Sequence, residues 1–363
     1  MSRKLTFIVP GDPDQPTGGY RFDRRICSEL RQRGWHVELI GLGGRFPVTD
    51  SRVDSRARQA MDATLAGLAK DSAVVIDGLA MGGLPEVVRA YRRRLDITAL
   101  VHHPLFDETG LSPARQKKLK ILETAALQGA NRVIATSRFT ADRLVRLGMI
   151  AGPAQVVEPG VDSAPIGHRV RARLQGRESG PEQLLCVASL VARKGHRFLI
   201  EALAGLGCHD WRCTLAGPDN RDSDCAAAVR SDIHASGLAE RFELTGAVSQ
   251  AGLDGLYDQA GLFVLPSLFE GYGMVVTEAL ARGLPLLTTD GGALGFTAPK
   301  SAAIHVPAGN SLALATALVR WFETPALRRD LTGGALEARS RLCDWGRACN
   351  AFIRALTAPA APA

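Results

Sequence analysis

The chain has 363 residues, of which 46% are hydrophobic and 22% are charged, a composition typical of a globular protein with two domains. No run of about 20 apolar residues occurs, so a membrane-spanning helix is not expected. The net charge is +7, but aromatic residues make up only 6% and do not interleave with the basic runs, which argues against nucleic-acid binding.

Seven cysteines are present, and none belongs to a Cys-x-x-Cys pair. The pattern therefore indicates neither a zinc site nor a disulfide framework. We expect buried free thiols and a protein of the reducing cytoplasm.

The first half of the chain alternates strand and helix patterns. Residues 5–10 form an apolar run typical of a strand, and a loop rich in Gly, Pro and Asp follows it. An amphipathic helix then ends at Gly34, and a second strand begins near His36. Further strands are expected over residues 72–80, 97–106, 131–137 and 154–162. This alternation predicts a doubly wound α/β domain over residues 1–163.

The second half repeats this organisation. Residues 164–183 are polar, basic and interrupted by Gly and Pro, as in a linker between domains. A second α/β domain is expected over residues 184–345, followed by a helix over 346–356 and a disordered tail over 357–363. We therefore expect two Rossmann-like parallel-sheet domains facing a cleft, because such sheets bind ligands beyond the carboxyl ends of their strands.

The most informative stretch is residues 265–281, LPSLFEGYGMVVTEALA. Pro266 ends an apolar strand pattern, and a glycine-containing turn leads into a helix. Such a turn leaves free backbone N–H groups at a positive helix end, which is an anion-binding arrangement. Glu270 and Glu278 frame the turn. A ligand with both phosphate and hydroxyl groups, such as a nucleotide sugar, fits this pattern.

Two further residues of the second half suit a phosphorylated ligand. Arg193 and Lys194 follow a strand and precede Gly195 and a helix, where adjacent cations can neutralise a diphosphate. A solvated basic turn is the alternative. Glu278 lies in a mostly apolar helix, where an unpartnered carboxylate is unfavourable, and this favours a functional role over an ordinary surface charge.

The first half offers two candidate pairs. His102 and His103 end a strand, and an ordinary histidine of a turn is the alternative for each. Gly18 and Gly19 follow the first strand and allow backbone to approach a phosphate, although they can also belong to a plain loop. They lack the G-x-G-x-x-G spacing, which argues against a dinucleotide-dependent dehydrogenase.

Taken together, these segments resemble the retaining family 4 glycosyltransferases, which have the GT-B fold. The resemblance is carried by VASLVARKGHRFLIEALA and by the segment from FELTGAV to TTDGGAL. The first half adds TGGY, RVIATSRFTADRL and VVEPGVD, so the resemblance covers nearly the whole chain. It implies a glycosyltransferase (EC 2.4) that moves a sugar from a nucleoside-diphosphate donor to a hydroxyl acceptor with retention of the anomeric configuration.

The resemblance also implies roles for individual residues. Arg193 and Lys194 would hold the donor diphosphate, Glu270 would bind hydroxyls of the transferred sugar, and Glu278 would bind the ribose. His102 or His103 would contact the sugar, with His102 favoured because it directly follows the apolar run. Backbone groups would complete the donor site, at Gly18, Gly19, Gly271, Tyr272, Gly273 and Met274.

The sequence predicts that the enzyme needs neither a metal nor a cofactor. No Asp-x-Asp pair follows a strand, and Asp222 and Asp224 lie in a polar loop before a helix, where a capping role is expected. Two alternatives to transfer stay open. One is a GT-B sugar-nucleotide epimerase or phosphorylase, and the other is a non-catalytic protein that binds nucleotide sugars.

The acceptor also stays open, between a glycan, a glycolipid and a cell-envelope polysaccharide precursor. Basic runs at residues 92–94 and 114–120 suit peripheral contact of a cytoplasmic protein with the anionic inner face of a membrane. Solvated helix faces are the alternative for these runs.

Overall fold

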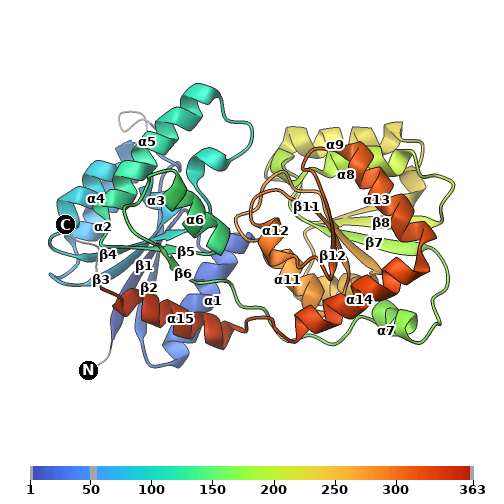
Figure 1. The fold of residues 1–363 in the computed structure, drawn as a ribbon. Helices are drawn as coiled ribbons and strands as arrows, with labels where there is room; N and C mark the ends of the chain where they lie inside the picture. The colour runs from blue at the N-terminus through green and yellow to red at the C-terminus, as the bar shows by residue number, and fades with distance from the viewer. Residues whose placement is uncertain (1–2, 50–54, 360–363) are drawn as a thin grey trace. The chain divides into compact units, whose positions relative to one another are not determined.

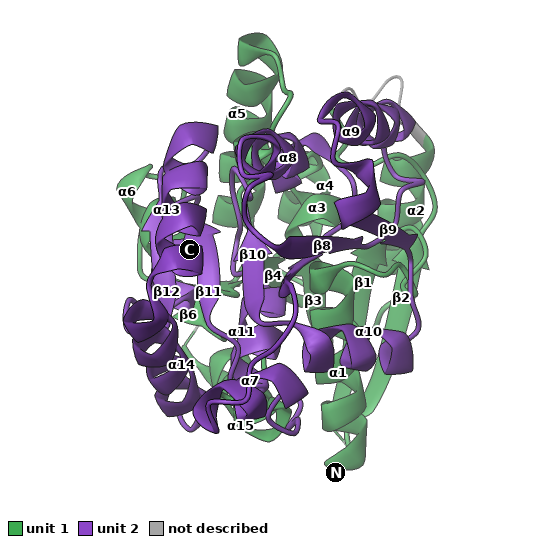
Figure 2. Ribbon diagram, turned by 90° about the vertical axis from the view of Figure 1, so that its right-hand side faces the viewer, with its two compact units in different colours: residues 1–160, 343–363 green, residues 161–342 purple. Residues whose placement is uncertain are grey.

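The computed structural model describes residues 3–49 and 55–359 (Figure 1). The chain divides into two compact units, one of residues 1–160 and 343–363 and the other of residues 161–342 (Figure 2). Of the predicted tail, residues 360–363 lie outside the described part of the chain, and Thr357 is still the last residue of a helix.

Unit 1 is built on a six-stranded, wholly parallel sheet with the order β2-β1-β3-β4-β5-β6. Its strands are β1 (Lys4–Pro10), β2 (His36–Leu42), β3 (Ala73–Asp77), β4 (Asp96–Val101), β5 (Arg132–Ala135) and β6 (Gln155–Val156). Its helices are α1 (Gly18–Gln32), α2 (Ser55–Ala66), α3 (Gly78–Met81), α4 (Pro85–Tyr91), η1 (Leu105–Asp107), α5 (Pro113–Gly129), α6 (Arg138–Arg146) and α15 (Trp345–Thr357). Strand β1 is buried on both faces after its first residue, as a continuous apolar run in a parallel sheet should be. Strand β3 is shorter than expected because α3 begins at Gly78.

Helix α15 belongs to unit 1, although it follows the whole of unit 2 in sequence. The Phe352 ring stacks on Phe7 of β1 at a centroid distance of 6.2 Å, and Trp345 lies against Phe22 of α1 at 6.2 Å. These aromatic contacts explain why the helix returns to the first sheet. The sequence pattern predicted the helix without indicating which domain it covers.

Unit 2 has a second six-stranded parallel sheet, with the order β12-β11-β10-β7-β8-β9. Its strands are β7 (Glu182–Val187), β8 (Trp211–Ala216), β9 (Phe242–Gly246), β10 (Leu262–Leu265), β11 (Leu286–Thr289) and β12 (Ala303–Val306). Its helices are α7 (His168–Leu174), η2 (Ala192–Lys194), α8 (His196–Ala204), α9 (Ser223–Ala235), η3 (Ala239–Arg241), α10 (Gln250–Gln259), α11 (Met274–Ala281), α12 (Leu294–Thr297), α13 (Ser311–Glu323) and α14 (Pro325–Arg339). The core centres on β7, β10 and β11 and includes the fully buried Trp211, Trp321 and Phe263. The predicted fold class of two Rossmann-like parallel sheets is confirmed.

Residues 164–183, which we expected to form a linker, contain helix α7 and belong to unit 2. Arg173 of this helix is buried. Its guanidinium bonds Glu178 and the carbonyl of Gly261, and it lies 4.8 Å over the ring of Trp321. The segment is therefore packed into the second domain, because a buried guanidinium requires these partners.

Several local predictions are confirmed. Strand β10 ends at Leu265, directly before Pro266, and Asp222 caps α9 by accepting a hydrogen bond from Cys225 N at 3.0 Å. The seven cysteines are free thiols. Four of them are buried as expected, whereas Cys225 and Cys343 are partly exposed and Cys208 is exposed.

Candidate functional site

Both sheets reverse their strand order at one point, and the candidate residues follow the strands at that point. In unit 1, β1 lies between β2 and β3, and in unit 2, β7 lies between β10 and β8. Connections on the two sides of such a point leave in opposite directions, which opens a crevice at the carboxyl ends of the strands. The residues after β1, β3 and β4, and those after β7, β10 and β11, are therefore the ones to inspect.

The turn after β7 places two cations beside the end of β10. Arg193 and Lys194 form the short helix η2, which ends at Gly195 with a φ of +68°. A Cβ atom on Gly195 would lie 2.1 Å from the carbonyl oxygen of Pro266. Leu268 N also donates to the carbonyl of Arg193 at 2.8 Å. A glycine is therefore required for this turn to lie against the loop that carries Glu270.

Glu270 is the centre of a charged network in unit 2. Its Oε1 accepts hydrogen bonds from Lys194 Nζ at 2.5 Å and from Ser267 Oγ at 2.7 Å. Arg193 Nη1 lies 3.4 Å from Oε2 and donates to the carbonyl of Phe269 at 2.6 Å. The two cations and one carboxylate carry a net charge of +1, an arrangement that suits a bound polyanion.

Burial and charge act in opposite directions in this network. Glu270 is only 6% exposed, and burial by itself raises its pKa, but Lys194 and Arg193 outweigh burial and lower the pKa to about 2. Burial also lowers the pKa of Lys194, and there the attraction of Glu270 only partly compensates. Mutual attraction therefore keeps these three groups charged, and removal of one changes the others.

The loop after β11 fixes the backbone of Glu270. Ala293 N donates to the carbonyl of Glu270 at 2.8 Å, and Glu270 and Gly292 form an isolated parallel bridge. Gly292 has a φ of +68°, and a Cβ atom there would lie 2.3 Å from the Glu270 carbonyl oxygen. Gly273, with a φ of +90°, occupies the N-cap position of α11 and has no side chain with which to cap it. The positive end of α11 therefore carries no side-chain cap. The donor-binding role of Gly271 to Met274 stays a prediction.

Glu278 is buried in α11 and has a partner that sequence reasoning missed. The hydroxyl of Tyr257, a fully buried residue of α10, donates to Glu278 Oε2 at 3.2 Å. The guanidinium of Arg282 lies 4.5 Å over the Tyr257 ring. Because Tyr257 supplies one partner, the burial of Glu278 does not by itself indicate a ligand. The role of Glu278 in ribose binding stays a prediction.

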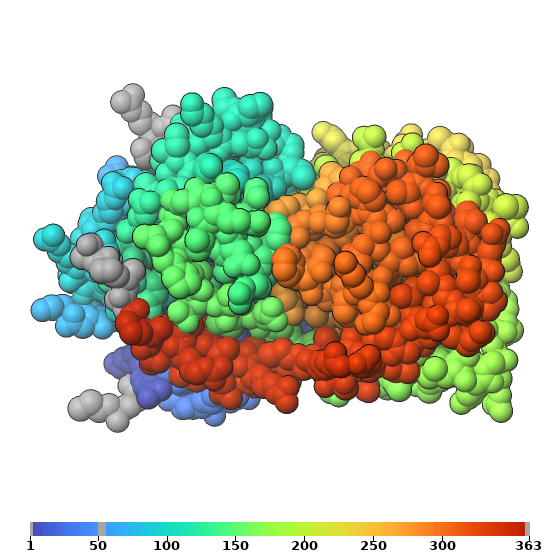
Figure 3. Space-filling view, viewed as in Figure 1, coloured from blue at the N-terminus to red at the C-terminus, as the bar shows by residue number. Residues whose placement is uncertain are grey.

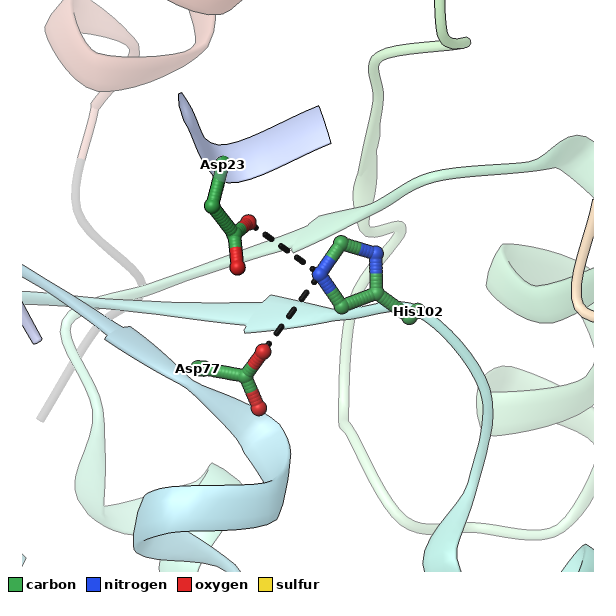
Figure 4. A group of neighbouring side chains, drawn as sticks. All are labelled: Asp23, Asp77 and His102. Carbon is green, nitrogen blue, oxygen red and sulfur yellow. Dashed lines mark hydrogen bonds and ion pairs between the residues drawn. The ribbon is translucent and has the colours of Figure 1, made fainter. Parts of the chain in front are cut away.

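In unit 1, His102 lies between two carboxylates (Figure 4). Its Nε2 is 3.2 Å from Asp23 Oδ1 and 3.4 Å from Asp77 Oδ2. Asp23 belongs to α1, Asp77 ends β3, and His102 directly follows β4. Within the described part of the chain, these three residues are the one group of His, Cys, Asp or Glu whose ligand atoms lie close enough for a metal ion, within 4.8 Å of one another.

The charges in this group shift its titration. Burial by itself lowers the pKa of His102, but the two carboxylates and their hydrogen bonds outweigh it and raise the pKa to about 10. Burial raises the pKa of Asp23 to about 6, although His102 opposes this shift.

The other candidates of unit 1 separate into two places. Gly18 and Gly19 begin α1, and a Cβ atom on Gly19 would lie 3.2 Å from Cδ2 of His102, so this glycine leaves room for the imidazole. His103 turns to another partner, with its Nε2 3.5 Å from Oε2 of Glu108. Of the two histidines, only His102 lies with the buried carboxylates.

Two sequence signals point to the carboxylates that the sequence reading did not select. Asp23 falls on the apolar stripe of α1, beside Phe22, Ile26 and Cys27, where a surface charge is unexpected. Asp77 ends an apolar strand at the sheet edge where ligands bind. Ser267 and Tyr257 carry no comparable signal, because a serine in a loop and a tyrosine in a helix are ordinary.

Comparison with family models gives two matches. The model described as Glycosyltransferase Family 4 matches residues 18–164, and the model described as Glycosyl transferases group 1 matches residues 181–324. The first match begins at α1, after β1, and contains β2 to β6 of unit 1, whereas the second contains all six strands of unit 2. Together they span both sets of candidate residues.

Curated relatives align over parts of the chain. A phosphatidyl-myo-inositol mannosyltransferase of Mycobacterium leprae is 31% identical over 45% of this chain and 42% of its own length. A GDP-mannose:cellobiosyl-diphosphopolyprenol alpha-mannosyltransferase of Xanthomonas oryzae is 30% identical over 73% of this chain and 65% of its own length. The chain spans about half, or less, of the length of the first curated relatives it matches, at 42%, 40% and 51%.

Among solved structures, a sucrose-phosphate synthase from Thermosynechococcus elongatus has a TM-score of 0.79. The match covers 97% of this chain and 98% of that one at 21% identity. At this identity the likeness establishes the fold, which is GT-B.

Proposed function

The chain belongs to the family 4 glycosyltransferases, and on that premise we propose that it transfers a sugar from a nucleoside-diphosphate donor to a hydroxyl acceptor with retention of the anomeric configuration. The observation that carries this proposal is the network in which the half-buried Arg193 and Lys194 contact the buried carboxylate of Glu270. It combines a net positive charge with a carboxylate at the carboxyl ends of β7 and β10.

In this proposal the two cations act on the leaving group. The bond between the anomeric carbon and the diphosphate oxygen breaks, and the electron pair stays on that oxygen. Arg193 and Lys194 stabilise the charge that develops there, which is the largest contribution protein groups usually make to such a step. The acceptor oxygen then bonds to the anomeric carbon on the same face, and its proton passes to the departing diphosphate.

The remaining residues orient the donor. Glu270 accepts hydrogen bonds from sugar hydroxyls, and Glu278 accepts from the ribose, because a carboxylate can receive two neighbouring hydroxyls at once. The backbone of Gly271, Tyr272, Gly273 and Met274 donates to the ligand. In unit 1, His102 is the proposed sugar-binding histidine, and Gly18 and Gly19 are the proposed phosphate-binding glycines.

We further propose that the acceptor is lipid-linked and that the enzyme works on the anionic inner face of a membrane from the cytoplasm. Two relatives act, by their names, on a phosphatidyl-inositol and on a diphosphopolyprenol. Helix α5 supports contact with anionic lipid, because Arg115, Lys117 and Lys118 are exposed, as is Ile121. Figure 3 shows this segment at the surface of unit 1. No helix in the described part of the chain is both long and apolar enough to cross a bilayer.

Vesicle sedimentation tests this membrane proposal. Binding to vesicles with 30% anionic lipid should fall as salt rises from about 50 to 500 mM and should weaken in Lys117→Glu/Lys118→Glu. Binding that ignores salt, anionic lipid and both substitutions would contradict it.

Release of nucleoside diphosphate tests the proposed activity. UDP-, GDP- and ADP-linked hexoses are incubated with the protein, with and without polyprenyl-phosphosugar acceptors, after a thermal-shift screen selects the nucleotide. We expect turnover by the wild type and a loss of at least about a hundredfold in Lys194→Met, while Lys300→Met, at an exposed lysine, retains activity. A non-catalytic binder would shift the unfolding temperature without turnover. An epimerase would change the sugar and keep the diphosphate bond.

A further inference from the structure

The donor-binding roles proposed above leave Asp23 without a function. Among the described residues, its side chain has one hydrogen-bond partner, His102, and Oδ2 has none. Asp23 is only 1% exposed and lies on the apolar face of α1. Burial of a carboxylate is costly, so a helix gains nothing from it unless the group serves a partner.

We propose that Asp23 is a positioning residue that, together with Asp77, holds the imidazole of His102 in one orientation and in its cationic form. The Nδ1–H group of His102 is then a permanent hydrogen-bond donor to a ligand. The identity of this ligand as the transferred sugar rests on the proposed function. The orientation and charge of His102 do not depend on that function.

The two carboxylates contact one ring nitrogen of His102 and leave the other on the opposite side of the ring. Both carboxylates approach Nε2, and Nδ1 lies on the other side of the ring (Figure 4). The Phe22 ring meets His102 edge-on at a centroid distance of 5.6 Å, and Gly19 leaves space beside Cδ2. The imidazole is thus held on several sides, and its Nε2 proton is shared between two acceptors.

Of the two carboxylates, Asp23 is the one whose substitution tests the contact with His102 more specifically. Asp77 also caps α3, because its Oδ1 accepts from Leu79 N at 2.6 Å, so its substitution would disturb the fold as well. Asp23 has no such second task. Replacement by Asn keeps the size of the side chain and an oxygen that can accept from Nε2, removes the charge, and puts an amide NH2 in place of the second oxygen.

The charged groups that face His102 set the pH range of this state. They are Asp23 from α1 and Asp77 from the end of β3, while the hydroxyls of Thr136 and Thr140 donate to the His102 carbonyl. Arg24 is close enough to Asp23 to oppose the rise of its pKa. With a pKa of about 6 for Asp23 and about 10 for His102, both are charged between these values.

Nitrogen NMR of ¹⁵N-histidine-labelled protein tests the proposal directly. His102 is assigned by comparison with His102→Gln. In the wild type we expect both ring nitrogens of His102 to be protonated at pH 7.5, with no titration between pH 6.5 and 8.5. In Asp23→Asn we expect the titration midpoint to move down toward this range. In Asp96→Asn, at the opposite end of β4, we expect the wild-type signature.

Kinetics of the same variants separate positioning from fold. In the donor-turnover assay, Asp23→Asn should lower kcat by about tenfold or more and leave KM for the donor within about threefold. In a His102→Gln background, Asp23→Asn should cause little further loss, because both substitutions remove one unit. Asp23→Asn should lower the unfolding temperature, because the buried His102 cation loses one of its two carboxylate partners, so kcat and KM are measured at a temperature where the variant is fully folded.

Three results would overturn the inference. One is a neutral His102 in the wild type at pH 7.5, and another is an unchanged His102 spectrum in Asp23→Asn. The third is a stoichiometric divalent cation whose removal by EDTA changes the His102 signals, because a metal ion would occupy the place of the Nε2 proton. If the spectra agree but no sugar donor turns over, the inference stands and the proposed function fails.

Discussion

Replacement of Gly195 by alanine tests whether the turn after β7 must lie against β10. The residue has a φ of +68°, and the new Cβ atom would lie 2.1 Å from the Pro266 carbonyl oxygen. The left-handed conformation costs about 1–2 kcal/mol, and overpacking against a backbone atom adds about 1–3 kcal/mol. Relief of the contact requires a shift of about 1 Å, which displaces Arg193 and Lys194 and lowers kcat/KM for the donor about a hundredfold.

Gly176→Ala is the matched control for this prediction. Gly176 also belongs to unit 2 and has a φ of +64°, but a Cβ atom there would meet nothing within 4 Å. It should lose about 1 kcal/mol of unfolding free energy, or about 2–4 °C in Tm, and keep full donor turnover. Denaturant unfolding and NDP release measure both variants. If Gly195→Ala turned over donor as fast as Gly176→Ala, the argument that contact with Pro266 places the cations would be refuted.

Three further substitutions follow from the contacts of unit 2 and of α15. Glu270→Gln should lower kcat/KM by about a hundredfold, whereas the exposed Glu201→Gln should not. Because the pKa of Glu270 is lowered to about 2, its stabilising effect is present above pH 4.5 and lost as the pH falls toward 2. In urea unfolding at pH 6, the free energy of unfolding of the wild type should exceed that of Glu270→Gln by up to about 3 kcal/mol, and this difference should disappear in acid. Tyr257→Phe should raise donor KM about tenfold, because Glu278 loses a hydrogen bond. The control Tyr91→Phe, which loses a bond to the surface Asp62, should leave KM unchanged. Equal KM values in the two variants would contradict a role of Tyr257 in holding Glu278 for the donor. Phe352→Ala should destabilise unit 1 by about 3–5 kcal/mol, because its ring stacks on Phe7, and an unchanged Tm would show that α15 contributes little.

Residues close together in sequence allowed the best predictions. The end of β10 at Pro266, the cap at Asp222 and the alternation of strands and helices all depend on local backbone chemistry. The sequence predicted that Lys194 and Glu270 belong to one site, but not that they bond each other directly. That bond depends on the close approach of Gly195 to Pro266.

Contacts between distant segments were not visible in the sequence. The group of Asp23, Asp77 and His102 depends on three elements that meet only when β1, β3 and β4 lie side by side. The return of α15 to unit 1 depends on Phe352 and Trp345 matching aromatic rings more than 300 residues earlier, and a periodic apolar helix face does not say which sheet it covers.

The stereochemistry of donor cleavage tests the central claim most directly, and it needs no knowledge of the acceptor. A donor carrying ¹³C at the anomeric carbon, with the nucleotide chosen by thermal shift, is followed by NMR during slow hydrolysis by the wild type and by Lys194→Met. Transfer with retention predicts that the first sugar released by the wild type has the anomeric configuration of the donor and that Lys194→Met releases sugar at least about a hundredfold more slowly. Release of the opposite anomer, or cleavage by Lys194→Met at the wild-type rate, would contradict the assignment of a retaining transferase that depends on Lys194.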